Sequence, residues 1–331
     1  MKTAMKVGLV WMALAVPAAA GEAQNWKKQL PPVERVPAYL QEISVMIQAS
    51  NASGSGVIKT RIIDGQKVSF VWTAAHVVAN LRTTEEIVDP TTGTKRTAVR
   101  YSDAQIVKEL VEDGRKVGEF RMNARVIRVN KDEDLALLRL RKRAITETSC
   151  VFYLDTDIPP LGTRLLHVGS LLGQTGANSM TSGIVSQIGR VLNDNGVELE
   201  YDQTTVTAFP GSSGGGVYLE NGAYIGMLVR GAGEQFNLII PVRRMVRWAK
   251  SAKVYWALDD SAPVPTEAEL ERLPIEDVGQ MWKGAGPADP AKPVPVKTLI
   301  WQGTWNGVDS RIGVSGKAGS AMALDIGDGS D

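Results

Sequence analysis

Four turn dipeptides between residues 38 and 240 constrain the fold of this chain more than any other feature of its sequence. Each is an Asp-Gly or Asn-Gly pair between short β-rich runs, such as VIKTRII and KVSFVW. These pairs favour type I′ hairpins, because both central positions of that turn need a positive φ. Long helical periodicity is scarce here, so we predict an antiparallel all-β architecture, either a sandwich or a barrel. The four pairs are Asp64-Gly65, Asp113-Gly114, Asn195-Gly196 and Asn221-Gly222.

One helix is predicted from residue 241 onward. Pro241 opens the run PVRRMVRWAKSAKVYWAL, and proline suits the first turn of a helix because its missing N–H has no partner there. Apolar residues recur at helical spacing at Val242, Met245, Val246 and Ala249. We interpret the opposite, basic face as solvated, with contact to an anionic lipid or polymer as the alternative. That face consists of Arg243, Arg244, Arg247 and Lys250.

The composition changes after Asp260. Residues 261–331 hold seven of the chain's 16 prolines and a Gly/Ser/Asp-rich end, so we predict a mostly disordered tail over residues 256–331. Thr266 and Glu269 form a candidate capping box for a short helix within it. The stretch LIWQGTWNG, with Trp301 and Trp305, is an exception that can form a strand, dock on the main body or bind a partner.

The N-terminus resembles a secretory signal. MKTAMK supplies two lysines, a short apolar run follows, and Ala18-Ala19-Ala20 precedes Gly21. We therefore predict a signal peptide over residues 1–20, an N-terminal extension over residues 21–37, and a periplasmic or extracellular location. An uncleaved anchor is the alternative, although the apolar run is shorter than the roughly 20 residues that span a bilayer. No other segment predicts a membrane span.

Charge and cysteine usage narrow the possible functions. Lysine and arginine total 37 against 36 acidic residues, so nothing favours a nucleic-acid partner. Cys150 is the only cysteine, which excludes an internal disulfide and suits a bacterial envelope protein. We interpret Cys150 as a small buried apolar residue rather than a nucleophile, because no histidine lies near it in the sequence. The sequence indicates no oligomeric state.

Candidates for a catalytic base and its orienting acid are few. Of the two histidines, His76 follows an apolar β-like run in SFVWTAAHVVANL, whereas His167 in TRLLHVGSLLG has the pattern of a buried strand residue. Asp134 begins the apolar run DLALLRL and is therefore held rigidly. Its rivals Asp132 and Glu133 lie further out in a charged loop.

The stretch AFPGSSGGGVYL offers a nucleophile. A Gly/Ser run is often a flexible linker, but here small residues can also let the backbone fold tightly around one hydroxyl. In that arrangement the N–H groups of Gly211 and Ser213 point at one site and form an oxyanion hole. We assign the attack to Ser213, because Ser212 occupies the variable position of the pattern.

Together, TAAH, DLALL and GSSGG resemble the trypsin-like (chymotrypsin-fold) serine peptidases, in their order of His, Asp and Ser. GSGVI, HVGSLLG, QTT…FPGSSGG and IGMLVRG…IIPV are similar to the HtrA-type bacterial branch, and the resemblance covers roughly residues 40–252. It implies two six-stranded antiparallel β-barrels, at about residues 38–150 and 155–255, followed by a C-terminal helix. It also implies a triad of His76, Asp134 and Ser213, an acyl-enzyme intermediate, protein or peptide substrates, and no metal or organic cofactor.

The chain departs from the family pattern at several points. Ser212 stands where trypsin has the aspartate of its zymogen switch, Gly216 replaces a usual proline, and Thr205 replaces the aspartate of QTDA. None of these changes removes a member of the triad. No recognisable PDZ domain follows residue 255, which argues against a peptide-triggered chaperone–protease.

The resemblance also locates the S1 pocket, which receives the substrate side chain before the cleaved bond. Thr207 is expected near its base, with walls from residues 227–231, which include Val229, Arg230 and Gly231, and from Asn237 to Ile239. Because residue 207 is not an aspartate, we expect a small or medium apolar P1 side chain rather than arginine or lysine.

Two other functions compete with an exported serine endopeptidase. The first is an inert peptidase-like module that binds a partner through its cleft or its tryptophan-bearing tail. The second is a hydrolase of non-peptide esters, which the β-rich setting of Ser213 disfavours. The tail is also a candidate self-cleaved or inhibitory segment.

Overall fold

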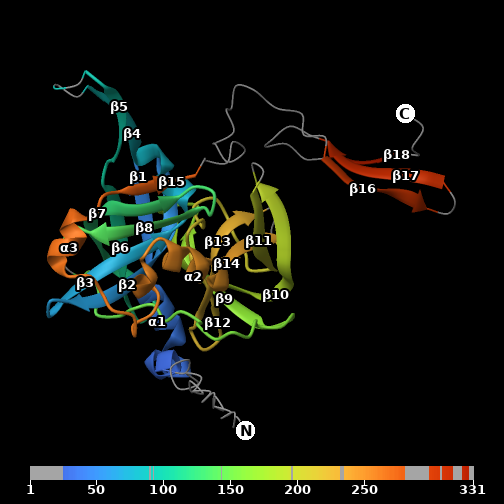
Figure 1. Ribbon diagram of the computed structural model, residues 1–331. Coiled ribbons are helices and arrows are strands. Elements are labelled where there is room, and N and C mark those ends of the chain that lie inside the picture. The colour runs from blue at the N-terminus through green and yellow to red at the C-terminus, as the bar shows by residue number, and fades with distance from the viewer. Residues whose placement is uncertain are drawn as a thin grey trace, which may run out of the picture. The chain divides into compact units, whose positions relative to one another are not determined.

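The computed structural model describes residues 25–88, 91, 93–142, 144–194, 197–231 and 235–279, with the backbone alone for residues 96 and 194, and it describes the backbone of residues 298–305, 308–315 and 323–327 (Figure 1). The signal peptide predicted over residues 1–20 lies outside these ranges. The chain divides into two compact units, residues 1–280 and 281–331. Each unit is described by itself below.

The first barrel closes through six antiparallel strands in the order β7-β6-β1-β2-β3-β8, with β8 pairing back on β7. The predicted turns Asp64-Gly65 and Asp113-Gly114 join β2 to β3 and β6 to β7, and all four residues have positive φ. A two-stranded hairpin of β4 and β5 is separate from the barrel. The bounds are β1 (Ser44–Ala49), β2 (Ala52–Ile63), β3 (Gln66–Thr73), β4 (Arg82–Val88), β5 (Lys95–Tyr101), β6 (Ala104–Glu112), β7 (Arg115–Asn130) and β8 (Leu135–Leu140).

The second barrel is closed in the order β10-β11-β14-β13-β12-β9, again antiparallel throughout. Gly222, at φ 88°, forms the predicted turn between β12 and β13, whereas Asn195-Gly196 lies outside the described residues. The prediction of two six-stranded antiparallel barrels is confirmed. The bounds are β9 (Arg164–Leu171), β10 (Gly176–Asp194), β11 (Val197–Thr204), β12 (Gly216–Leu219), β13 (Tyr224–Gly231) and β14 (Asn237–Pro241).

Short helices surround the barrels: η1 (Asn25–Gln29), η2 (Val33–Arg35), α1 (Val36–Ile43), η3 (Ala75–Leu81), α2 (Val242–Ser251) and η4 (Tyr255–Ala257). The helix predicted after Pro241 is α2, which Pro241 caps. Its basic face is not simply solvated. Arg244 is buried and pairs with Glu133 at 2.5 Å, and Arg243 pairs with both Glu200 and Asp202. These internal partners weaken the case for an anionic ligand on α2.

Residues 256–279 differ from the disordered tail expected to begin at residue 256. They form η4, α3 (Glu267–Arg272) and β15 (Glu276–Val278), and β15 pairs in parallel with β7 of the first barrel. Thr266 and Glu269 make the predicted capping box. Apolar and ion-pair contacts with the barrel order this segment, which its proline content did not reveal. We call residues 258–279 the strap.

The second unit contains a three-stranded antiparallel sheet in the order β16-β17-β18. The strand β16 includes most of LIWQGTWNG, which agrees with one of the three possibilities raised for that stretch. The bounds are β16 (Thr298–Trp305), β17 (Val308–Ser315) and β18 (Ala323–Gly327).

The core of the first unit is aromatic at its centre. Trp72 packs edge-on against Phe152 and Trp248, and Phe152 packs against Tyr224. Cys150 is fully buried beside them, and burial raises the pKa of its thiol far above the usual range. The thiolate is therefore not accessible as a nucleophile, in agreement with the structural interpretation of this cysteine.

Candidate active site

His76 lies in η3, the 3-10 helix of seven residues that follows β3. Its ring Nδ1 is 2.9 Å from Oδ2 and 3.0 Å from Oδ1 of Asp134. The backbone strengthens this contact, because the His76 N–H donates to Asp134 Oδ1 at 3.0 Å and the Ala75 N–H donates to the Asp134 carbonyl at 3.1 Å. The imidazole is thus held at Nδ1, and Nε2 is left for other chemistry.

Asp134 occupies the turn between β7 and β8. Its φ is 53°, a left-handed conformation that aspartate tolerates better than most residues. The two rival acids have other partners: Glu133 pairs with Arg244 of α2, and Asp132 lies against Gly279 of the strap. Of these three acids, Asp134 is the one that contacts His76.

The electrostatic setting favours a charged His76. Burial by itself lowers the pKa of the imidazole, but the charge and the hydrogen bond of Asp134 raise it, and the net pKa lies above the ordinary value. The guanidinium of Arg230 acts in the opposite direction. Asp134 therefore stabilises the imidazolium that forms when His76 accepts a proton.

Ser213 lies in a tight turn locked by the backbone. Its carbonyl accepts a hydrogen bond from the Ser55 N–H at 2.7 Å, and the next N–H, of Gly214, donates to Leu228 O at 2.8 Å. Gly214 has φ 88°, and a Cβ there would lie 2.2 Å from Ser55 O and 2.3 Å from Thr73 Oγ1. The glycine run is therefore a close-packed turn, not a slack linker.

The Ser213 turn and the His76 helix flank the same residue. A Cβ on Gly54 would lie 2.6 Å from the methyl groups of Val77, the neighbour of His76, and 3.1 Å from Ser213 O. The hydroxyl of Ser213 lies 3.4 Å from the carbonyl of Val229 on β13. Sequence segments that are more than 130 residues apart thus meet at one place.

The other predicted oxyanion donor, Gly211, is also in a special conformation. Its φ is 96°, and a Cβ there would lie 2.3 Å from Ser170 O. The N–H of Ser212 donates to Phe209 O at 2.9 Å. Within the described part of the chain, no backbone acceptor is bonded to the N–H of Gly211 or of Ser213. The assignment of these two donors to an oxyanion hole stays a prediction.

Ser55 is a residue that the sequence reasoning missed. Its buried hydroxyl donates to Gly211 O at 2.7 Å and accepts from the Ser170 N–H at 2.7 Å. It therefore fixes the Gly211 carbonyl from the first barrel. The motif GSGVI contained the signal, a small polar residue between two glycines, but its partners lie more than 110 residues away.

The predicted S1 residues gather at one end of β13 and β14. Gly231 pairs with Asn237 across the two strands, and Val229 and Arg230 precede it on β13. Thr207 follows β11, and its carbonyl accepts a hydrogen bond from Thr181 at 3.0 Å.

Asn237 makes the interior of this region polar. It is fully buried, and its Nδ2 donates to Val206 O at 2.7 Å. Its Oδ1 has no protein partner, and a Cβ on Gly231 would lie 2.2 Å from it.

His167 packs against the glycines that follow Ser213. It is fully buried in β9, its Nδ1 lies 2.9 Å from Gly216 O, and a Cβ on Gly215 would lie 2.7 Å from its ring. Burial lowers its pKa to about 4, so the ring is neutral at physiological pH. This agrees with the interpretation of His167 as a structural strand residue.

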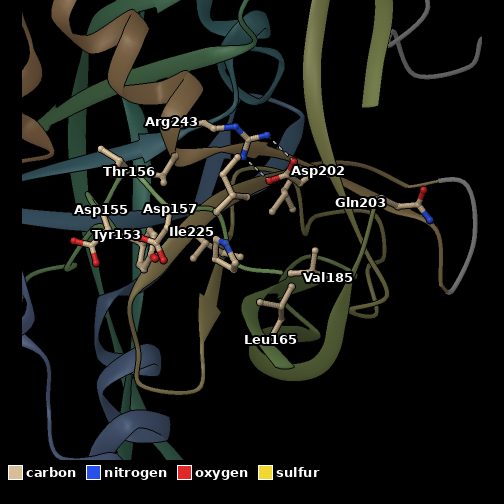
Figure 2. A pocket seen from close by; sticks show the side chains of 14 residues that line it. Tyr153, Asp155, Thr156, Asp157, Leu165, Val185, Asp202, Gln203, Ile225 and Arg243 are labelled. Carbon is tan, nitrogen blue, oxygen red and sulfur yellow. Dashed lines mark hydrogen bonds and ion pairs between the residues drawn. The ribbon is translucent and has the colours of Figure 1, made fainter. Parts of the chain in front are cut away.

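A separate pocket on the second barrel contains none of the predicted triad residues (Figure 2). One wall of this pocket is the segment that includes Asp155 and Asp157. The ion pair between Asp202 and Arg243 also lines it. In the described ranges, no group of three or more His, Cys, Asp or Glu side chains is arranged to hold a metal ion. No described helix has the length and apolar character needed to cross a membrane.

The chain is similar in sequence to known serine proteases. Residues 54–227 match the family model described as a trypsin-like peptidase domain. A stretch of 127 residues, 38% of the chain, is 30% identical to the serine protease Do-like HtrA of Lactobacillus helveticus, and it spans only 29% of that relative's length.

Two solved structures are also similar. The crystal structure of Deg5 has 21% identity and a TM-score of 0.47, covering 68% of this chain and 97% of the other. A serine endoprotease from Yersinia pestis has 16% identity and a TM-score of 0.48, covering 68% of this chain and 67% of the other.

Proposed function

This chain belongs to the trypsin-like peptidase family, whose model matches just over half of it, and we propose that it hydrolyses peptide bonds of protein substrates through His76, Asp134 and Ser213. Family membership assigns it to the serine endopeptidases. The triad, the acyl-enzyme and the substrate class are the parts that we propose.

The observation that carries this proposal is the contact between His76 Nδ1 and both carboxylate oxygens of Asp134. Asp134 selects the tautomer with the proton on Nδ1, so Nε2 is the basic nitrogen. Ser213 lies on the turn that packs beside the His76 helix, and its hydroxyl donates to Val229 O at 3.4 Å in this structure. The proposed mechanism requires this hydroxyl to turn toward Nε2, which accepts its proton as Oγ attacks the scissile carbonyl.

The rest of the cycle follows from the same groups. His76, now an imidazolium stabilised by Asp134, donates its proton to the leaving amine, and an acyl group stays on Ser213 Oγ. Water then attacks the acyl-enzyme, with His76 again as the base. The N–H groups of Gly211 and Ser213 stabilise the oxyanion of each tetrahedral intermediate.

We further propose that the S1 pocket takes a small or medium apolar side chain, because residue 207 is a threonine and offers no carboxylate to pair with a substrate cation. A peptide-library profile that showed a strict requirement for arginine or lysine at P1 would contradict this preference.

Export is proposed on the predicted signal peptide of residues 1–20, with a periplasmic or extracellular site of action. Detection of the mature N-terminus near residue 21 in the periplasm or medium tests it. An intact N-terminus in the cytoplasm would contradict it.

Covalent labelling tests the chemistry. The wild type should react with a fluorophosphonate probe at neutral pH, and Ser213→Ala should abolish the reaction. Ser212→Ala is the matched control: its hydroxyl accepts only the Phe209 N–H within the turn, so labelling should persist. A folded wild type that neither labels nor cleaves any library peptide would instead support an inert binding module.

A further inference from the structure

The strap is anchored to the first barrel along its whole length. Near its start, Arg61 Nη1 donates to Asp259 O at 2.8 Å. In its middle, Arg139 pairs with Glu271 at 2.8 Å and Arg125 Nη2 donates to Leu270 O at 2.8 Å. Figure 1 shows the strap running from α3 to β15 across the first barrel. The polypeptide thus returns from α2, next to the second barrel, to cover the first one.

The end of the strap reaches the segment that carries Asp134. On the parallel ladder between β15 and β7, Asp277 is opposite Val129. The Lys131 N–H, in the turn that follows β7, donates to Val278 O at 2.9 Å. Gly279 has φ 80°, and a Cβ there would lie 2.6 Å from Asp132 Cγ. The strap and the turn of residues 131–134 are therefore in direct backbone contact.

The side chain of Asp277 joins two different segments. Only 5% of it is exposed, and its carboxylate lies 2.7 Å from Arg82 Nε and 2.7 Å from Lys131 Nζ. The phenol of Tyr101, at the end of β5, also interacts with it, and the Gly279 carbonyl lies 3.4 Å from Lys131 Nζ. Arg82 Nε donates to Asp277 Oδ2, whereas Lys131 Nζ approaches Oδ1 as an ion pair without hydrogen-bond geometry. These groups surround one buried carboxylate with two cations and a phenol.

The two cations of this network, Arg82 and Lys131, lie close in sequence to the proposed catalytic residues. Arg82 is the residue directly after η3, the turn that contains His76, and Lys131 is three residues before Asp134. One carboxylate from the strap therefore ties together the two segments that supply the proposed base and its orienting acid. In the same turn, Glu133 pairs with Arg244 of α2.

We propose that Asp277 is a positioning residue of the site: it holds the His76 segment and the Asp134 segment at the spacing that lets the imidazole and the carboxylate meet. The proposal rests on the proposed function above. Asp134 has a left-handed backbone, and such conformations persist where the surrounding structure over-determines them. The network around Asp277 restrains the turn at Lys131, whereas Arg244 restrains it at Glu133.

The size of the expected effect follows from the sensitivity of catalysis to geometry. A displacement of about 1 Å caused by a remote substitution can cost on the order of 100-fold in rate. Asp277→Asn keeps the shape of the side chain but leaves Arg82 and Lys131 without their anion. We expect its kcat to fall by about 10- to 100-fold, with KM changed less than threefold, because Asp277 is buried and is not one of the proposed substrate-binding residues.

A pH profile separates positioning from simple loss of stability. His76 is faced by Asp134, which raises its pKa, and by Arg230, which lowers it. A weakened His76–Asp134 contact lowers the pKa of His76, so the acid limb of kcat/KM should move to lower pH in Asp277→Asn. Asp277→Glu, which keeps the carboxylate, should restore part of the rate and move the limb back.

Two neighbours on the strap are matched controls. Glu276 precedes Asp277 on β15 and pairs with Arg128 at 3.2 Å, and Glu271 on α3 pairs with Arg139. Their ion-pair partners are thus Arg128 and Arg139, whereas Arg82 and Lys131 pair with Asp277. Glu276→Gln and Glu271→Gln should therefore leave kcat and the acid limb at the wild-type values, whatever their effect on the thermal midpoint.

All variants are compared in the full mature chain, with kcat expressed per fluorophosphonate-titrated site. Equal kcat and equal pH profiles in the wild type and Asp277→Asn would overturn the proposal while the proposed function stands. If Asp277→Asn does not fold, Arg82→Gln is used in its place, because this variant removes only the Arg82–Asp277 contact. Arg82→Gln should also lower kcat and move the acid limb of kcat/KM to lower pH. A wild type that neither labels nor cleaves overturns both proposals together.

Discussion

In the first barrel, His76 and Asp134 are held by hydrogen bonds to the Asp134 carboxylate, by the Arg244–Glu133 ion pair and by the network around Asp277. In the second barrel, the Ser213 turn is held by backbone hydrogen bonds and by glycines that have no room for a side chain. The two halves of the site should therefore fail in different ways. Charge-neutralising substitutions disturb the acid–base half, whereas added methyl groups disturb the nucleophile half.

The largest effect is expected in the charged half. Asp134→Asn preserves shape but removes the anion that selects the His76 tautomer, so kcat should fall by about 10⁴-fold. Steady-state kinetics on a peptide substrate measures this. Asp132→Asn is the control, and a comparable loss in that variant would mean that the wrong carboxylate has been assigned.

The nucleophile half should respond to a single methyl group. Gly214→Ala places a Cβ 2.2 Å from Ser55 O, so we expect a loss of about 3 kcal/mol or more in the free energy of unfolding, with loss of labelling at Ser213. Chemical denaturation and probe labelling measure the two effects.

Gly65→Ala is the matched control for that substitution. Gly65 also has positive φ, at 75°, but no atom lies within 4 Å of a Cβ there. Only the left-handed backbone is then penalised, by about 1–2 kcal/mol, with full activity in the folded protein. Equal costs at the two glycines would show that close packing does not hold the Ser213 turn.

A smaller effect is expected from the cation near His76. Because Asp134 raises the pKa of His76, kcat/KM should fall as the pH drops through a value above that of ordinary histidine, as the base becomes protonated. Arg230 lowers the same pKa, so Arg230→Gln should move the acid limb to higher pH. A shift to lower pH in this variant would contradict the assigned electrostatics.

The smallest effect is expected at the middle of the strap. Glu271→Gln breaks the pair with Arg139, but 60% of the Glu271 side chain is exposed, and such pairs contribute about 0–1 kcal/mol. Thermal unfolding should show a shift of a few degrees at most. A loss as large as that of Gly214→Ala would mean that the strap, rather than the barrels, limits stability.

The sequence by itself determined the features that depend on neighbouring residues. Asp64-Gly65 and Asp113-Gly114 form the hairpins expected of them, Pro241 opens α2, and Thr266 with Glu269 caps α3, because a turn or a cap is decided within a few residues. His76, Asp134 and Ser213 could be singled out for the same reason, since each lies in a short recognisable motif.

Only the tertiary structure decided which distant groups share a partner. Ser55 holds Gly211, Arg244 is buried against Glu133, and Asp277 joins Arg82 to Lys131 across separations of 111 to 195 residues. Such contacts cannot be predicted from local sequence propensity. A charged residue in a proline-rich stretch is expected to be solvated unless a complementary surface in the folded protein buries it. The strap was expected to be disordered for that reason, and its order comes from the barrel on which it packs.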